Sequence, residues 1–198
     1  MKIIPRCVAT VVAAGLLLSG CAAVDPLAEQ YSAGRDSGYE SRDGSISEFA
    51  PTDRGEPIVF DGMTDAGHAV SSSDYAGEVL VVNFWYAACA PCRVEAPDLA
   101  ALSDKYQDAG ASFLGVNIYD QPDTSLAFAR NFNITYPSIM DADSGTARLA
   151  FAGHAPPSAV PTTLLLDKQG RVAARFIGLI EAPSILDAII SDLINEEL

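Results

Sequence analysis

The stretch Phe84–Pro97 reads FWYAACAPCRVEAP and carries two cysteines, Cys89 and Cys92, separated by an alanine and a proline. A disulfide between residues three positions apart closes so short a loop that it adds little to stability. The chain contains four cysteines, and the other two, Cys7 and Cys21, lie near its start. The sequence therefore predicts that Cys89 and Cys92 are present for chemistry and not for holding the fold together.

The N-terminal residues have the order of an export signal. Two basic residues precede an apolar run over residues 7–18, and small residues follow before Cys21. The four residues Leu18-Ser19-Gly20-Cys21 resemble the bacterial lipobox, which implies that residues 1–20 are removed as a lipoprotein signal peptide and that Cys21 carries a diacylglyceryl group. The alternative is an uncleaved anchor, because the apolar stretch over residues 7–24 approaches the length of a membrane-spanning helix.

Both interpretations place the rest of the chain on the extracytoplasmic side of the cell membrane, where thiols are not kept reduced by the cytosolic systems. The formal net charge is -14, which disfavours nucleic acid as a partner. The same charge is repelled by anionic lipid headgroups. We therefore expect the lipid on Cys21, and not the protein surface, to hold the chain to the membrane.

Composition divides the remainder into a tether and one domain. Residues 21–55 are rich in Ser, Gly, Asp and Glu with little periodicity, which is typical of a flexible segment. Residues 56–198 form a stretch of about 140 residues, near the commonest domain size.

Within residues 56–198, short apolar runs alternate with helical patterns. The predicted elements are a hairpin of Ile58–Phe60 and His68–Val70, strands over Val79–Phe84, Ala111–Ile118, Thr162–Leu166 and Val172–Ile177, and helices over Cys92–Asp108, Asp123–Phe132, Ser144–Phe151 and Pro183–Leu193. A strand, a helix and a second strand in succession predict a parallel pair. The order is βαβ followed by ββα with a helix-containing insert between them, which resembles the thioredoxin fold. We expect an α/β protein with a central mixed sheet flanked by helices.

Three segments carry a more specific resemblance. They are NFWYAACAPCRVEAP (83–97), TYPSIMDADSGTARLAF (135–151) and VPTTLLLDKQGRV (160–172). All three resemble the TlpA/ResA-like branch of thioredoxin-fold proteins. The resemblance implies a thiol-disulfide oxidoreductase that needs no metal or organic cofactor. It also implies exported protein thiols or disulfides as substrates, with apocytochrome c in cytochrome c maturation as the leading candidate, and a membrane electron donor or acceptor as partner.

The Cys-x-x-Cys spacing suits thiol-disulfide exchange. A thiolate is the attacking species, and the positive end of a helix dipole lowers the pKa of a cysteine placed there. Cys89 lies where the strand passes into the helix, and Pro91 suits the first helical turn because it has no N–H to leave unpaired. Cys92, one turn into the helix, can return to resolve a mixed disulfide.

Four further residues are candidates for the site. Glu95 lies one turn after Cys92, where the matching family glutamate tunes proton transfer; the alternative is a solvated surface glutamate. The resemblance implies a cis bond before Pro161, which would let the backbone of Val160 bind an extended substrate; the alternative is an ordinary turn proline. Trp85 is assigned to substrate binding, with simple packing as the alternative.

Two departures from the family pattern concern the same site. Ala88 stands where many relatives carry a tryptophan, so we expect a more open surface around Cys89. Asn83 replaces the buried aspartate of thioredoxin itself, in agreement with the TlpA-like branch.

Other chemistries fit less well. Structural zinc requires four ligands, and the chain offers no second cysteine pair and only two histidines, His68 and His154. Cu(I) delivery by the two thiolates, with His154 recruited as a third ligand, remains an alternative function. A disulfide-forming oxidase of exported proteins is the other alternative, since the sequence does not determine the direction of electron flow.

Overall fold

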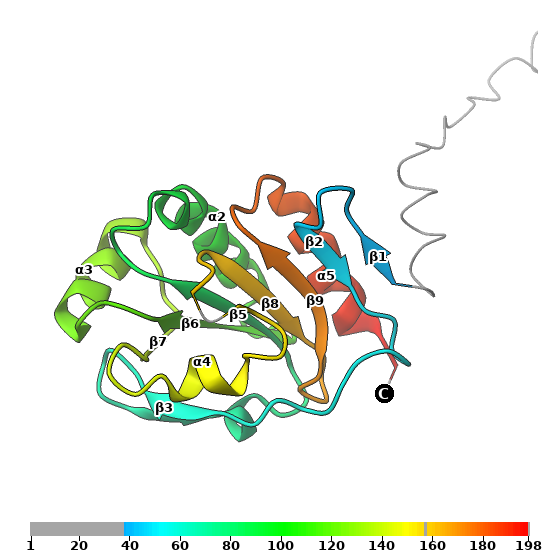
Figure 1. Ribbon diagram of the computed structural model, residues 1–198, viewed down its shortest axis with the longest axis horizontal. Coiled ribbons are helices and arrows are strands. Elements are labelled where there is room, and N and C mark those ends of the chain that lie inside the picture. Colours follow the sequence, from blue (N-terminus) through cyan, green and yellow to red (C-terminus); the bar gives the residue numbers. More distant parts are fainter. Residues whose placement is uncertain (1–37, 157, 198) are drawn as a thin grey trace, which may run out of the picture. The chain divides into compact units, whose positions relative to one another are not determined.

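The computed structural model describes residues 38–156 and 158–197. Its strands are β1 Tyr39–Glu40, β2 Ile46–Glu48, β3 Asp61–Met63, β4 Ala69–Ser71, β5 Val79–Trp85, β6 Ala111–Asn117, β7 Ser138–Met140, β8 Thr162–Leu166 and β9 Val172–Ile177. Seven of them form one mixed sheet in the order β1-β2-β9-β8-β5-β6-β7, while β3 and β4 form a separate hairpin (Figure 1). The parallel pairing expected between β5 and β6 is confirmed.

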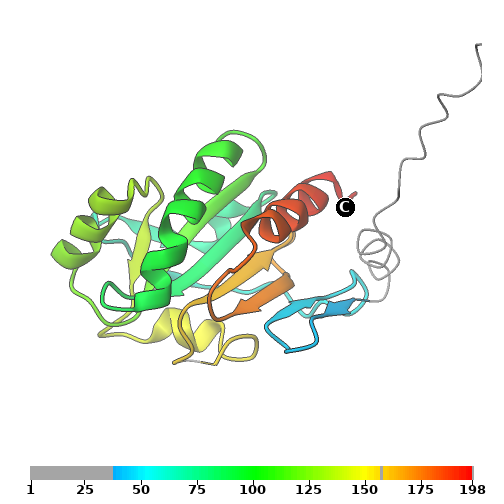
Figure 2. The same ribbon diagram turned by 90° about the horizontal axis from the view of Figure 1, so that it is seen from above.

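Helices cover both faces of the sheet. They are the short 3-10 helix η2 Ser72–Tyr75 and the α-helices α2 Ala90–Tyr106, α3 Pro122–Phe132, α4 Thr146–Ala150 and α5 Pro183–Asn195. Helices α2, α3 and α5 lie on one face, and α4 lies on the other face with the β3–β4 hairpin (Figures 1 and 2).

The centre of the sheet explains the continuous apolar run of β5. All seven of its residues are buried, because β5 pairs with β6 on one side and β8 on the other and has helices on both faces. Val82 and Phe84 pack into the core that includes Phe151, beyond α4. Trp85 faces the opposite way and packs with the cysteines. The strand therefore ends directly at the candidate site.

Most predicted elements are present with small shifts of their ends. The two strands before the last helix have the predicted bounds, and helix α2 begins at Ala90, two residues earlier than expected. The predicted N-terminal hairpin is present, with its arms at 61–63 and 69–71. Strand β7 was not predicted, since it is only three residues long and follows Pro137 directly.

Residues 38–55 correct the expected tether. Here β2 pairs antiparallel with β9, and β1 pairs with β2, so the segment extends the sheet. Arg54, with a side chain only 5% exposed, pairs with Asp167 at 3.0 Å and with Glu196 at 2.7 Å. The polar composition suggested a solvated segment, but the backbone of β2 pairs with β9 and the side chain of Arg54 pairs with two carboxylates. The predicted signal peptide, the predicted lipidation site Cys21 and the rest of the predicted tether lie outside the described residues.

None of the helices within 38–156 and 158–197 combines the length and apolar character needed to span a membrane. The apolar run over residues 7–24 lies outside this range.

Candidate active site

Cys89 and Cys92 form a disulfide at the N-terminus of α2. Cys89 is the residue that caps the helix, and its sulfur accepts a hydrogen bond from the backbone N–H of Cys92 at 3.2 Å. Pro91 occupies the first turn, as expected. The sulfur of Cys89 therefore lies at the end of a helix where unpaired N–H groups and the helix dipole stabilise negative charge.

Glu95 is buried, which excludes the solvated alternative. Its side chain is on α2 one turn after Cys92, and the residue is 1% exposed. Its Oε1 accepts a hydrogen bond from Nδ2 of Asn83 at 2.9 Å, and its Oε2 accepts one from the backbone N–H of Ile180 at 3.2 Å. Burial raises the pKa of Glu95 to about 7, although both hydrogen bonds act in the opposite direction.

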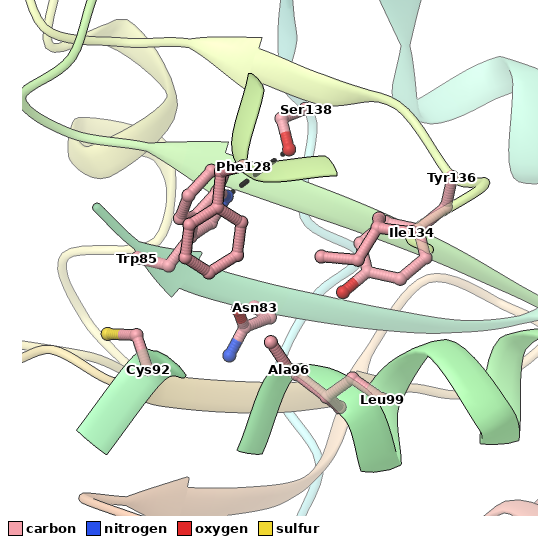
Figure 3. Close-up of a pocket in the computed structure, with 9 residues that line it drawn as sticks. All are labelled: Asn83, Trp85, Cys92, Ala96, Leu99, Phe128, Ile134, Tyr136 and Ser138. Carbon is pink, nitrogen blue, oxygen red and sulfur yellow. Dashed lines mark hydrogen bonds between the residues drawn. The ribbon is translucent and has the colours of Figure 1, made fainter. Parts of the chain in front are cut away.

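A small cavity lies between α2 and the sheet beside Cys92 (Figure 3). It offers the centre of a water molecule about 10 Å³, which is room for one. Asn83 and Tyr136 are among the residues that line it. Burial raises the pKa of the Tyr136 hydroxyl, and the charge of Glu95 adds to this rise.

Trp85 is part of the wall of this cavity and not of the surface. It is 5% exposed, stacks on Phe128 with ring centroids 4.3 Å apart, and donates from Nε1 to Oγ of Ser138 at 3.2 Å (Figure 3). An indole held in this way has almost no face open to a partner, because the sheet and α3 cover it. The assignment of Trp85 to substrate binding is therefore corrected to packing.

Val160 and Pro161 lie against the cysteines. The bond between them is cis, as the family resemblance implied, and Val160 packs on the cluster that contains Cys89 and Cys92. The C=O of Pro161 accepts from the N–H of Gly178. Within the described residues, by contrast, neither backbone group of Val160 has a hydrogen-bond partner. An extended peptide could use both groups.

The surface around Cys89 is less open than Ala88 suggested. Ala88 itself is exposed, but Cys89 is only 3% exposed. Tyr86 and Ala87 pack against the cysteine cluster in its place. Oδ2 of Asp120 accepts from the N–H of Ala87 at 2.6 Å and so holds this loop. The residues next to Ala88 therefore cover Cys89 although the side chain at position 88 is short.

His154 does not complete a metal site with the cysteines. Among the described residues there is no group of three or more His, Cys, Asp or Glu side chains placed to hold a metal ion. The pKa of His154 is lowered by burial and by the nearby charge of Arg175, whose Nη1 donates to its carbonyl at 3.2 Å.

Three of the groups that build this site had no assigned role in the motifs. The Ile180 N–H and Asp120 come from loops far from the cysteines in sequence, and no local signal identifies them. Asn83 was noted only as a departure from thioredoxin. Its Nδ2 also donates to Oγ1 of Thr163, so one amide connects Glu95 to strand β8.

The chain resembles known thiol-disulfide proteins. It is 33% identical over 111 residues to the thiol-disulfide oxidoreductase ResA of Geobacillus kaustophilus, covering 56% of this chain and 61% of that protein. It is 38% identical over 102 residues to the thiol:disulfide interchange protein HelX of Rhodobacter capsulatus, covering 52% and 53%. The chain therefore spans roughly three fifths or less of the length of these curated relatives.

The fold has a clear match among solved structures. A secreted thiol-disulfide isomerase from Corynebacterium glutamicum superposes with a TM-score of 0.70 at 33% identity, covering 80% of this chain and 97% of that chain. The expected thioredoxin-like α/β fold is thereby confirmed. The family model described as the AhpC/TSA family matches residues 55–175, and the chain belongs to this family.

Proposed function

We propose that this protein is an extracytoplasmic thiol-disulfide oxidoreductase that reduces disulfides in exported proteins through Cys89 and Cys92. The observation that carries the proposal is the disulfide at the N-terminus of α2, with the buried Glu95 one turn behind it. The relatives named ResA and HelX support the same chemistry.

The first step uses Cys89. In the reduced protein its thiolate, stabilised by the N-terminal end of α2, attacks one sulfur of a substrate disulfide. A new bond forms between Cys89 and that sulfur, and the substrate disulfide breaks. The leaving substrate thiolate takes a proton from solvent. The backbone groups of Val160 hold the substrate segment during this step.

The second step uses Cys92. Its thiol loses a proton to the carboxylate of Glu95, directly or through the water that the cavity can hold. The resulting thiolate attacks the sulfur of Cys89, the mixed disulfide breaks, and the second substrate thiolate leaves. Two electrons pass to the substrate, and the protein keeps the Cys89–Cys92 disulfide until a donor dithiol at the membrane reduces it.

The location and the partners are further parts of the proposal. The lipobox-like residues before Cys21 support attachment to the cell membrane by lipid. The secreted relative from Corynebacterium glutamicum agrees with an extracytoplasmic position. The TlpA/ResA-like motifs support apocytochrome c as the substrate.

The reduction potential of the Cys89–Cys92 pair tests the direction of electron flow. The protein is equilibrated in glutathione or dithiothreitol buffers, and the fraction of disulfide is measured. A potential well below about -200 mV is expected for a reductant. A value near -120 mV would instead identify an oxidase of exported proteins.

Trapping of partners tests the roles of the two cysteines. In the Cys92→Ser variant, mixed disulfides on Cys89 should accumulate because they cannot be resolved. The Cys89→Ser variant, which is the matched control, should trap no partner and should not reduce insulin. Tight stoichiometric Cu(I) binding by wild-type protein that fails to reduce any disulfide would favour copper delivery instead.

A further inference from the structure

The disulfide is recessed within a surrounding ring of side chains that includes Tyr86, Tyr119 and Val160. Cys89 and Cys92 are each 3% exposed. Tyr86 and Val160 pack against the buried cluster that contains both cysteines. A protein sulfur can reach Cys89 only if the residues that flank it lie against this ring. The ring is therefore placed to select partners, provided that the exchange reaction proposed above takes place.

Two tyrosine side chains form one side of this surrounding ring. Tyr86 and Tyr119 meet edge to face, with ring centroids 5.1 Å apart and an interplanar angle of 86°. Tyr119 is 60% exposed, so one face of the pair is open to a partner. The two residues follow β5 and β6, whose C-terminal ends lie side by side.

The loops that carry this pair are held in place before any partner arrives. Asp120 accepts a hydrogen bond from the N–H of Ala87 and a second, at 2.8 Å, from Nδ2 of Asn117. Oδ1 of Asn117 accepts in turn from the N–H of Tyr119 at 3.1 Å. Because the contacts exist in the free protein, a partner loses little entropy in ordering this surface.

Asp120 places a carboxylate next to this pair, since it follows Tyr119 and accepts from the N–H of Ala87. On α2, Val94 is 63% exposed, and Asp98 lies one turn further along the helix. Arg93 adds its positive charge to the same helix, but its guanidinium lies over the ring of Phe132 and donates to the C=O of Ala87.

We infer that this ring selects extended partner segments that carry Lys or Arg beside the reacting cysteine, and that Tyr86 and Tyr119 form the principal contact. A cationic side chain can lay its alkyl stem on the exposed ring of Tyr119 while its charge interacts with the aromatic face. The carboxylate of Asp120 beside the tyrosine pair and the net charge of -14 favour the same partner.

The test uses the reduced full-length protein and three disulfide probes. Two synthetic peptides share one internal disulfide and differ only in two flanking Lys or two flanking Glu residues. The third probe is hydroxyethyl disulfide, which has no flanking residues. Oxidation is followed by the fluorescence of Trp85, the single tryptophan of the chain, which lines the cavity beside Cys92.

The basic peptide should react about tenfold faster than the acidic peptide at low salt, and the difference should shrink in 0.5 M NaCl. In Tyr119→Ala, the ratio of the rate with basic peptide to the rate with hydroxyethyl disulfide should fall about fivefold. Tyr119→Phe should keep this ratio. Leu149→Ala, at an apolar position on α4 that is 76% exposed, is the control and should also keep it.

Equal rates with the two peptides, or a ratio unchanged by Tyr119→Ala, would overturn the inference and leave the oxidoreductase proposal intact. Failure of the reduced protein to react with any of the three disulfides would overturn both.

Discussion

At the scale of a single residue, we expect Glu95 to make the chemistry of the dithiol depend on pH. It is buried, it accepts hydrogen bonds from Asn83 and Ile180, and its pKa is raised to about 7 mainly by burial. A group with this pKa is divided between its two protonation states near neutral pH. It is therefore suited to accept the proton of Cys92 and to release it again.

The same pKa predicts how stability depends on pH. Glu95 has an ordinary value of 4.5, so the folded protein binds more protons than the unfolded chain between pH 4.5 and about 7. The contribution of Glu95 to the free energy of unfolding is fully present below pH 4.5 and is lost as the pH rises through about 7. In Glu95→Gln this loss is absent. The free energy of unfolding of the variant relative to wild type should therefore rise by on the order of 2 kcal/mol between pH 5 and pH 8.

Urea unfolding of the oxidised proteins at several pH values measures this difference. Glu56→Gln, at an exposed position, is the control and should show the pH dependence of the wild type. A constant offset between Glu95→Gln and wild type across pH 5 to 8 would show that Glu95 does not titrate in this range.

At the scale of elements, length and pairing decided what could be predicted. Strands β8 and β9 were predicted from apolar runs on either side of a turn and have the predicted bounds, and helices α2, α3 and α5, which are long enough for a helical pattern, were confirmed with small shifts. Strands β2 and β7 have three residues each, which is too short for a pattern to emerge. They are strands because their backbones pair with neighbouring strands, β2 with β9 and β7 with β6.

The candidate site shows the same division. The two cysteines and Pro161 belong to local motifs and could be found in the sequence. The burial of Glu95 depends on the N–H of Ile180, which is 85 positions away. The position of Tyr119 depends on Asn117 and Asp120 at the end of another strand. Such contacts follow from the fold and not from spacing along the chain.

Helix α4 illustrates an element that depends on one buried side chain. Asp141, which is fully buried, accepts hydrogen bonds from the backbone N–H groups of Ala147 and Arg148, and it pairs with the Arg148 guanidinium at 2.9 Å. A helix of five residues has little stability of its own. It brings Phe151 into the core, so Asp141 supports packing beneath β5.

Replacing this carboxylate should therefore destabilise the whole domain. In Asp141→Ala, two N–H groups and the charge of Arg148 lose their partner, and we expect a loss of about 2–4 kcal/mol in the free energy of unfolding. Chemical denaturation monitored by Trp85 fluorescence measures it. Asp143→Ala, at an exposed position in the same loop, should change stability by less than about 0.5 kcal/mol. Similar losses in both variants would contradict the role given to Asp141.

At the scale of the whole molecule, the domain begins earlier than composition suggested. Strand β2 covers the edge of β9, and Arg54 connects the incoming chain to Asp167 and Glu196 near the end of α5. The predicted tether therefore does not extend through residues 38–55, since β1, β2 and Arg54 join this part of the chain to the folded domain.

Two truncated proteins test this boundary. A protein starting at Gly38 keeps β1 and β2, whereas one starting at Glu56 exposes the backbone groups of β9 and leaves Asp167 without Arg54. An uncovered strand edge pairs readily with other chains. We expect the longer protein to be monomeric. The shorter one should lose about 2–4 kcal/mol in its free energy of unfolding and should self-associate. Light scattering and urea unfolding measure both effects.

The Arg54→Ala variant of the longer protein separates the loss of stability from the self-association. It removes the ion pairs and retains the strands, so it should be less stable but still monomeric. Equal free energies of unfolding and a monomeric state for both truncated proteins would place the domain boundary at residue 56.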